Sequence, residues 1–159
     1  METSNFSFSL PRYKSLPDVG LYLDQVVRYV NDILEPLDLC ITASMISNYV
    51  KKGYIDRPSK KLYFADQIAY IIFIAISKQV LSMENIVILF DLQKETYKID
   101  IAYDTFCSEL EEMLNKILSG DESITPLSAD ADFSKKTLRS VVLAISHIIN
   151  LNYYFKSKS

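Results

Sequence analysis

Histidine, cysteine and glycine are scarce in this sequence, and each scarcity argues against a class of site. The 159 residues include one histidine, two cysteines and three glycines. Cys40 and Cys107 belong to no C-x-x-C or Cys/His cluster, so the sequence predicts neither a disulfide framework nor a zinc site and favours reduced, buried thiols. Three glycines are too few for the loops that cradle phosphate groups.

Motifs of catalysis are missing as well. The sequence contains no G-x-x-x-x-G-K-S/T, G-x-G-x-x-G, G-x-S-x-G or H-E-x-x-H pattern. The single histidine, His147, lies in an apolar stretch. This favours a core or interface position over a ligand or a general base, because those roles need partners within reach. We therefore expect no metal, no cofactor and no enzymatic activity.

No apolar run approaches the length of a membrane span. The stretches 68–76 and 141–149 are each about nine residues long, against the roughly 20 that a helical span needs. The first residues lack a basic region followed by an apolar one, so they do not resemble a signal peptide. We expect a cytoplasmic protein that does not contact a membrane.

Charge is distributed unevenly along the chain. The whole sequence has 17 Lys and Arg against 20 Asp and Glu, a net charge of −3, which argues against a uniformly basic nucleic-acid binder. Residues 41–64 contain five cations and one anion, or +4, which leaves 12 cations and 19 anions, or −7, elsewhere. Any contact with DNA is therefore expected in this segment.

Helical spacing of apolar residues predicts an almost entirely helical chain. Residues 1–18, with two prolines and many serines, are expected to form an extended arm. Helices are expected at 21–34 and at 42–52, the second with Thr42 as its N-cap and Gly53 just after its end.

The next segment predicts a small β wing. Residues 54–64 contain a proline and two lysines before a Leu-Tyr-Phe run, a pattern typical of a two-stranded turn with a basic tip. A helix over 66–79, apolar almost all round, is expected at the centre of the core. A short helix capped by Ser82 and ending near residue 90, and then a polar connector at 91–98, are expected to follow.

The C-terminal region predicts a dimer. Apolar residues recur at spacings of four and three along a helix over 99–118, and a last helix over 134–152 is also rich in Val, Leu and Ile. The seam consists of Ile99, Tyr103, Phe106, Leu110, Met113 and Ile117. Because two helices cannot hide this much apolar surface, we expect residues 97–159 to form a homodimer. The alternative is that they fold back onto the 66–79 helix within one monomer.

The helix expected at 42–52 has two contrasting faces. One face is apolar and can dock onto the domain, with Met45, Ile46, Tyr49 and Val50. The other carries short polar side chains and then two lysines, at Ser44, Ser47, Asn48, Lys51 and Lys52. Hydroxyl and amide groups can read base edges in the major groove, and lysines can neutralise phosphates. Arg57, Lys60 and Lys61 of the wing would reach the adjacent DNA backbone. The alternative is an ordinary amphipathic helix with a solvated polar face.

The order of these elements resembles the DNA-binding domain of the MerR-type transcription regulators. In that family a tyrosine of the recognition helix precedes a glycine by four residues, and a wing and a helix opening with a small or polar residue follow. Here Tyr49 precedes Gly53 by four, and Ser82-Met83-Glu84-Asn85-Ile86 resembles the last element. The family's arginine and tyrosine just before the first tyrosine are Ser47 and Asn48 here, so those phosphate contacts are not carried over.

A second resemblance covers most of the chain. It is carried by Leu10-Pro11-Arg12-Tyr13, Leu16-Pro17, Leu21-Tyr22-Leu23-Asp24-Gln25-Val26-Val27 and the stretch from Ile41 to Gly53. These segments are similar to the bacterial family known as domain of unknown function 1836. The resemblance implies a MerR-like winged helix with a helical appendage and, at most, a regulatory role, since the family has no assigned biochemical function.

The sequence thus predicts an all-α protein with a MerR-like winged helix-turn-helix. Its expected parts are an N-terminal arm (1–18), the winged domain with a small β wing (19–92) and a helical dimerisation region (97–159). The leading hypothesis is a transcription regulator that binds double-stranded DNA as a homodimer at a pseudo-palindromic site. The alternative, favoured by the overall acidity, is a winged-helix adaptor that contacts proteins and has no DNA affinity. A third hypothesis places a small apolar effector between the C-terminal helices, near Phe106 and Met113.

Overall fold

Residues 7–121 and 123–159 are described by the computed structural model, and they divide into two compact units. The first, here called the N-terminal unit, is residues 11–87. The second, the C-terminal unit, joins residues 7–10 to the chain from residue 88 onward. The expected arm is therefore shared between the units, since Phe8 and Leu10 are buried in the C-terminal unit.

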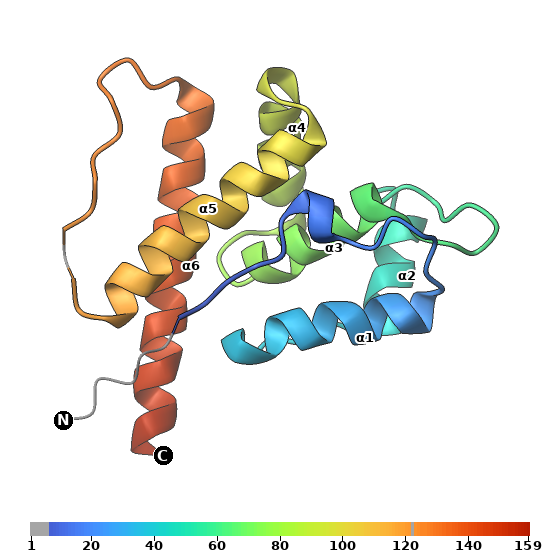
Figure 1. Ribbon diagram of the computed structural model, residues 1–159, viewed down its shortest axis with the longest axis horizontal. Coiled ribbons are helices and arrows are strands. Elements are labelled where there is room, and N and C mark those ends of the chain that lie inside the picture. Colours follow the sequence, from blue (N-terminus) through green and yellow to red (C-terminus); the bar gives the residue numbers. More distant parts are fainter. Residues whose placement is uncertain (1–6, 122) are drawn as a thin grey trace. The chain divides into compact units, whose positions relative to one another are not determined.

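The N-terminal unit is built around one apolar helix. Its elements are η1 (Tyr13–Ser15), α1 (Leu23–Leu34), η2 (Glu35–Leu37), α2 (Ala43–Lys51) and α3 (Ala65–Ser77). α1 packs against both α2 and α3 (Figure 1). α3 buries eight of its 13 residues, so it forms the centre of this unit, as its uniformly apolar sequence predicts.

The predicted helix-capping residues are confirmed. Thr42 Oγ1 accepts a hydrogen bond from the Met45 N–H at 3.2 Å, which caps α2. Ser82 Oγ accepts from the Asn85 N–H at 3.2 Å and caps α4 (Met83–Thr96). Gly53 follows α2 with a φ of 80°, a left-handed conformation that glycine adopts without strain.

The predicted β wing at 54–64 is wrong. In the described part of the chain there is no β-strand, and β pairing is confined to two isolated antiparallel bridges. These bridges join Ser59 to Leu62 and Leu21 to Tyr63. The next hydrogen-bonded pair of a hairpin ladder would join Arg57 to Phe64, but the Phe64 N–H donates to Gln67 Oε1 and α3 begins at Ala65. Residues 54–64 therefore contain a basic turn without strands.

The C-terminal unit contains the end of α4, then α5 (Ile99–Leu118) and α6 (Phe133–Lys158). The expected connector at 91–98 is mostly helical, because α4 continues to Thr96. Gln93 on this continuation is buried, and its side-chain amide donates to the Ser134 carbonyl at 3.2 Å. α6 begins after its N-cap Asp132, as the hydrogen bond from the Lys135 N–H shows, and extends six residues beyond the predicted end at residue 152.

The seam predicted to form the dimer is covered within the C-terminal unit. α5 packs against α6, and Phe8 is tied to α5 by two hydrogen bonds with the Asn115 side chain, at 3.0 and 3.2 Å. On α5 the buried residues are Tyr103, Phe106, Cys107, Leu110, Met113 and Leu114. On α6 the buried apolar residues are Leu138, Val141, Val142, Ile145 and Ile149. Four of the six seam residues therefore belong to the core of this unit, and Ile99 and Ile117 at the ends of the seam are half-buried.

Candidate nucleic-acid interface

α2 turns its polar face to solvent. Ile46 and Tyr49 are buried on its inner side. Ser44, Ser47 and Asn48 are exposed, at positions that a helix places on one face. α2 therefore presents hydroxyl and amide groups, which can hydrogen-bond to base edges.

A Schellman motif ends α2 and fixes the path of the chain beyond it. Its hydrogen bonds run from the Gly53 N–H to the Val50 carbonyl (3.0 Å) and from the Tyr54 N–H to the Tyr49 carbonyl (2.9 Å). Lys51 and Lys52 lie in this last turn, and both are exposed. Two cations thus stand at the carboxyl end of the polar face, where they also complement the helix dipole.

The turn at Ser59–Leu62 presents two more lysines. Hydrogen bonds between Ser59 and Leu62 close it in both directions, at 3.0 and 2.9 Å. Lys60 and Lys61 have φ angles of 51° and 68°, which makes this a two-residue turn of type I′. Such positions favour Asn and Gly, and a residue with a Cβ loses roughly 1–2 kcal/mol there. Both lysine side chains are exposed at the tip of the turn.

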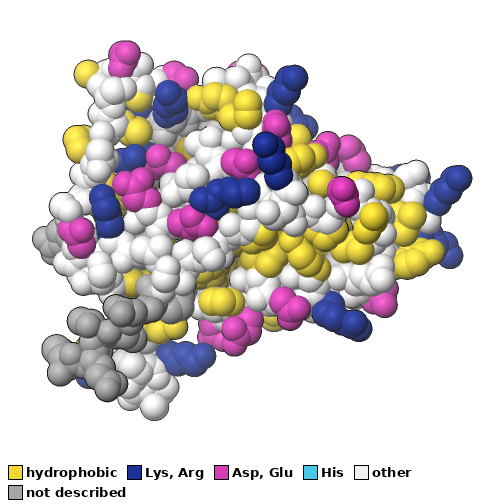
Figure 2. Space-filling view, viewed as in Figure 1, with side chains coloured by type: hydrophobic (Ala, Val, Ile, Leu, Met, Phe, Trp, Pro, Cys, Tyr) yellow, Lys and Arg dark blue, Asp and Glu magenta, His cyan; other side chains and the backbone are white. Residues whose placement is uncertain are grey.

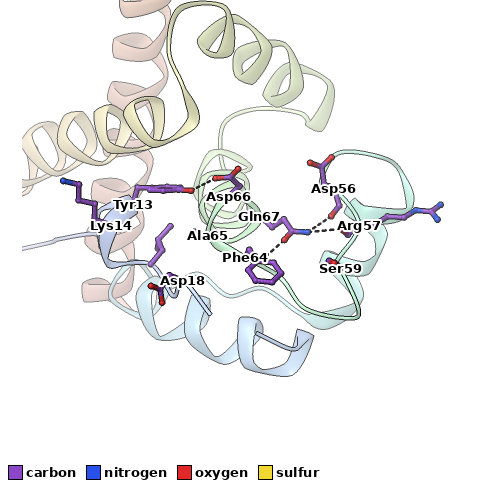
Figure 3. A pocket seen from close by; sticks show the side chains of 11 residues that line it. Tyr13, Lys14, Asp18, Asp56, Arg57, Ser59, Phe64, Ala65, Asp66 and Gln67 are labelled. Atoms are coloured by element: carbon purple, nitrogen blue, oxygen red, sulfur yellow. Dashed lines mark hydrogen bonds between the residues drawn. The ribbon is translucent and has the colours of Figure 1, made fainter. Parts of the chain in front are cut away.

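The base of the turn is anchored to the start of α3 by one side chain. Gln67 donates its amide hydrogens to the Asp56 and Arg57 carbonyls, at 3.0 and 3.1 Å, and accepts from the Phe64 N–H at 2.8 Å (Figure 3). The Arg57 side chain points away from Gln67 and is exposed. Because Gln67 holds the backbone, the turn leaves the unit in a fixed direction.

An open hollow of about 660 Å³ lies between η1, the turn and the start of α3. Its lining mixes charges of both signs, with two cations, Lys14 and Arg57, and three anions, Asp18, Asp56 and Asp66 (Figure 3). Tyr13 donates a hydrogen bond to Asp66, which closes part of the wall. This mixture favours no single ligand class, so the basic character of the unit belongs to α2 and the turn.

The eight predicted contact residues are all exposed, and they come from two neighbouring segments of the N-terminal unit. They are Ser44, Ser47, Asn48, Lys51, Lys52, Arg57, Lys60 and Lys61. Behind the turn, Tyr63 is buried, and burial raises the pKa of its phenol, so it stays neutral. In Figure 2, Lys and Arg side chains lie at the edge of the view, on the side where Figure 1 draws the turn.

One cation near α2 was missed by sequence reasoning. Lys78, at the end of α3, donates a hydrogen bond from Nζ to the Tyr49 hydroxyl at 2.9 Å. The two residues are 29 positions apart, so no local pattern pairs them. The bond adds a positive charge beside α2 and ties the two helices together.

Two other expectations are met only in part. His147 is exposed on α6, which excludes the core position and leaves the interface position that the sequence also allowed. Cys40 is exposed, whereas Cys107 is buried as expected. Within residues 7–121 and 123–159, no group of three or more His, Cys, Asp or Glu residues is arranged to hold a metal ion. In the same residues no helix is long and apolar enough to cross a membrane.

Comparison with known families agrees with the resemblance seen in the sequence. The family described as Domain of unknown function (DUF1836) matches residues 11–106, more than half of the chain. The chain belongs to the DUF1836 family. The DUF1836 match begins where the N-terminal unit begins and contains all eight candidate contact residues. It ends at Phe106 within α5, so α6 lies outside it. No solved structure and no curated protein sequence matches the chain.

Proposed function

We propose that this protein binds double-stranded DNA through α2 and the Ser59–Leu62 turn, and that it acts as a transcription regulator. The observation that carries the proposal is the joint exposure of a polar helix face and a lysine-tipped turn. α2 supplies groups that can read bases, and the turn supplies cations held on a constrained backbone. One unit thus carries the two kinds of side chain that specific recognition needs.

The arrangement suits a MerR-like mode of binding. α2 would lie in the major groove as the recognition helix, with Ser44, Ser47 and Asn48 toward the bases. The turn would take the place of a wing and set Lys60 and Lys61 against the adjacent backbone. Because Ser47 and Asn48 replace the arginine and tyrosine of the MerR type, phosphate binding would rest on the lysines.

The charge distribution supports one orientation on DNA. Residues 41–64 carry +4 and the remainder of the chain −7. Opposite net charges of this kind steer a polyanion toward the basic segment and away from the acidic parts of the chain. The acidic balance of the whole chain is therefore compatible with DNA binding at one place.

A salt titration tests the proposal. Fluorescence anisotropy with a labelled duplex is expected to give a log–log salt slope of about −3 to −4 per protomer, from about four phosphate contacts. For variants that remove lysines of the interface, the matched control is the replacement of the exposed Lys135 and Lys136 of α6 with Ala, because these lysines lie outside the interface. Lack of affinity for any duplex at about 50 mM salt would overturn the proposal.

A second candidate function is a protein-binding adaptor without DNA affinity. Val19, Tyr22 and Phe64 are 66%, 54% and 42% exposed in the N-terminal unit. The antiparallel bridge between Leu21 and Tyr63 places Tyr22 and Phe64 on its two opposite sides, so exposed apolar surface flanks the bridge close to the turn. If an adaptor is the true function, Tyr22→Ser with Phe64→Ser abolishes partner capture while the four interface lysines are dispensable.

A further inference from the structure

α6 carries a regular stripe on the side opposite its buried face. The stripe consists of Ser140, Ala144, His147, Leu151, Tyr154 and Lys158. Successive members are separated by four, three, four, three and four residues, the 3.5-residue repeat of helices that pack lengthwise. All six are exposed, although the opposite side of the helix is buried against the unit.

The carboxyl-terminal end of α6 is exposed on every side. All residues from 151 to 159 are exposed, including Leu151 at 47%, Tyr154 at 57% and Phe155 at 60%. A helical segment of this length is marginal in water on its own, because helix stability in proteins comes from packing of an apolar face. Large apolar side chains gathered on such a segment indicate a surface that packs on a partner.

We propose that α6 pairs antiparallel with α6 of a second copy of the chain along this stripe. The stripe's spacings read the same in both directions, so a two-fold axis level with residue 149 brings all six positions of one helix onto six of the other. Ser140 would face the partner's Lys158, Ala144 the partner's Tyr154, and His147 the partner's Leu151. Each contact then occurs twice, as a closed two-fold interface requires.

The sizes of the side chains select this orientation. The stripe is small at one end, with Ser140 and Ala144, and large at the other, with Tyr154 and Lys158. Antiparallel pairing places small side chains against large ones, which fills space evenly. Parallel pairing would set Tyr154 against its own copy and leave a gap at the small end.

The pairing along α6 does not depend on the proposed DNA interface, and the two interfaces differ in the part that charge plays. α6 contains five cations and no Asp or Glu. Arg139 is neutralised by Glu109, with Nε to Oε2 at 2.7 Å, and the lysines lie toward the helix ends. Burial of Ala144, Leu151 and Tyr154 therefore drives pairing. Added salt strengthens the pairing or leaves it unchanged, while it weakens DNA binding.

Sedimentation of the full chain at micromolar concentration tests the pairing. We expect a particle of twice the 18.2 kDa chain mass. Ala144→Arg places a bulky charge within the contact, against the partner's Tyr154, and is expected to raise the dimer Kd about thirtyfold or more. Asn152→Arg adds the same charge on the other side of the helix, at an exposed position, and is expected to leave the dimer intact. Circular dichroism verifies that both variants keep their helical content.

Cross-linking tests the orientation. In a Cys40→Ser background, a mixture of one protein with Ala144→Cys and another with Tyr154→Cys is expected to form a disulfide-linked heterodimer, whereas each protein alone forms little. A monomeric wild type overturns the proposal, and so does a dimer that Ala144→Arg leaves unchanged. Self-cross-linking through position 144 shows a parallel pair and also overturns it. Loss of DNA binding with an intact dimer contradicts only the proposed function.

Discussion

The exposed faces of α2 and α6 differ in a way that distinguishes two kinds of contact. Both helices bury one face in the core of their unit, and both leave a regular row of residues in solvent. On α2 the row is made of short polar groups that end in lysines, which suits a hydrated, charged ligand. On α6 the row includes Ala144, Leu151 and Tyr154, whose apolar surface suits a dry contact with another protein surface. Exposure alone is therefore uninformative until the chemistry of the exposed row is considered.

Removing the interface lysines should weaken DNA binding and leave the pairing through α6 unchanged. In a variant with Ala at Lys51, Lys52, Lys60 and Lys61, DNA affinity is expected to fall roughly 1,000-fold at about 100 mM salt, since each phosphate contact releases counterions. The loss should be similar for specific and random duplexes, and the sedimentation of the protein should not change. Anisotropy titrations on both duplexes measure the effect. A loss confined to one sequence would show that the lysines do not contact phosphates.

Truncating one side chain on each side of α6 should show that the buried face contributes more to the stability of the monomer than the exposed stripe does. Ile145→Ala removes a fully buried side chain and is expected to lower the free energy of unfolding by about 2–5 kcal/mol. Leu151→Ala, at a position 47% exposed, should cost the monomer less than about 0.5 kcal/mol. Urea unfolding at concentrations below the dimer Kd measures both. Equal losses would mean that Leu151 belongs to the monomer core.

On α2 the polar face should respond selectively. Asn48→Ala is expected to weaken binding to a selected site by roughly 1–3 kcal/mol and to relax the preference at one base position. Selection from a random library identifies the site, and titrations on selected and random duplexes then measure the difference. If the variant weakens both equally, Asn48 contacts the backbone and does not read a base.

Local signals allowed most of the N-terminal unit to be predicted from the sequence. Thr42, Gly53 and Ser82 cap their helices through side chains or φ angles that nearby residues determine, and the apolar pattern of α3 places it in the core. Long-range contacts escaped prediction. The burial of Gln93 depends on a carbonyl 41 residues away, and no local pattern indicates that contact.

The errors at the wing and at the dimer seam have physical causes. Periodicity shows that a helix has an apolar face but does not say what covers it, so the seam on α5 predicted a second copy where α6 provides the cover. Likewise, the composition of residues 54–64 indicates a turn but does not determine how many residues pair. The eight residues predicted for the interface are all exposed, and their contact with DNA stays a prediction. The left-handed conformation of the two lysines in the turn was not predicted.

The left-handed conformation of Lys60 and Lys61 leads to the smallest expected effect. Its test separates the effect of backbone strain on stability from the effect of lysine charge on DNA binding. Lys60→Gly with Lys61→Gly should relieve two left-handed residues, a gain of roughly 1–2 kcal/mol each, offset by about 0.4–1 kcal/mol each for the greater freedom of glycine in the unfolded chain. The net expectation is a stabilisation of about 1 kcal/mol in urea unfolding. Lys60→Ala with Lys61→Ala removes the same charges but keeps the strain, so its stability should equal that of the wild type. Both variants should lose DNA affinity to the same extent. If the glycine pair destabilises the protein, the turn does not hold its lysines in left-handed conformations, and the backbone argument for a constrained basic tip fails.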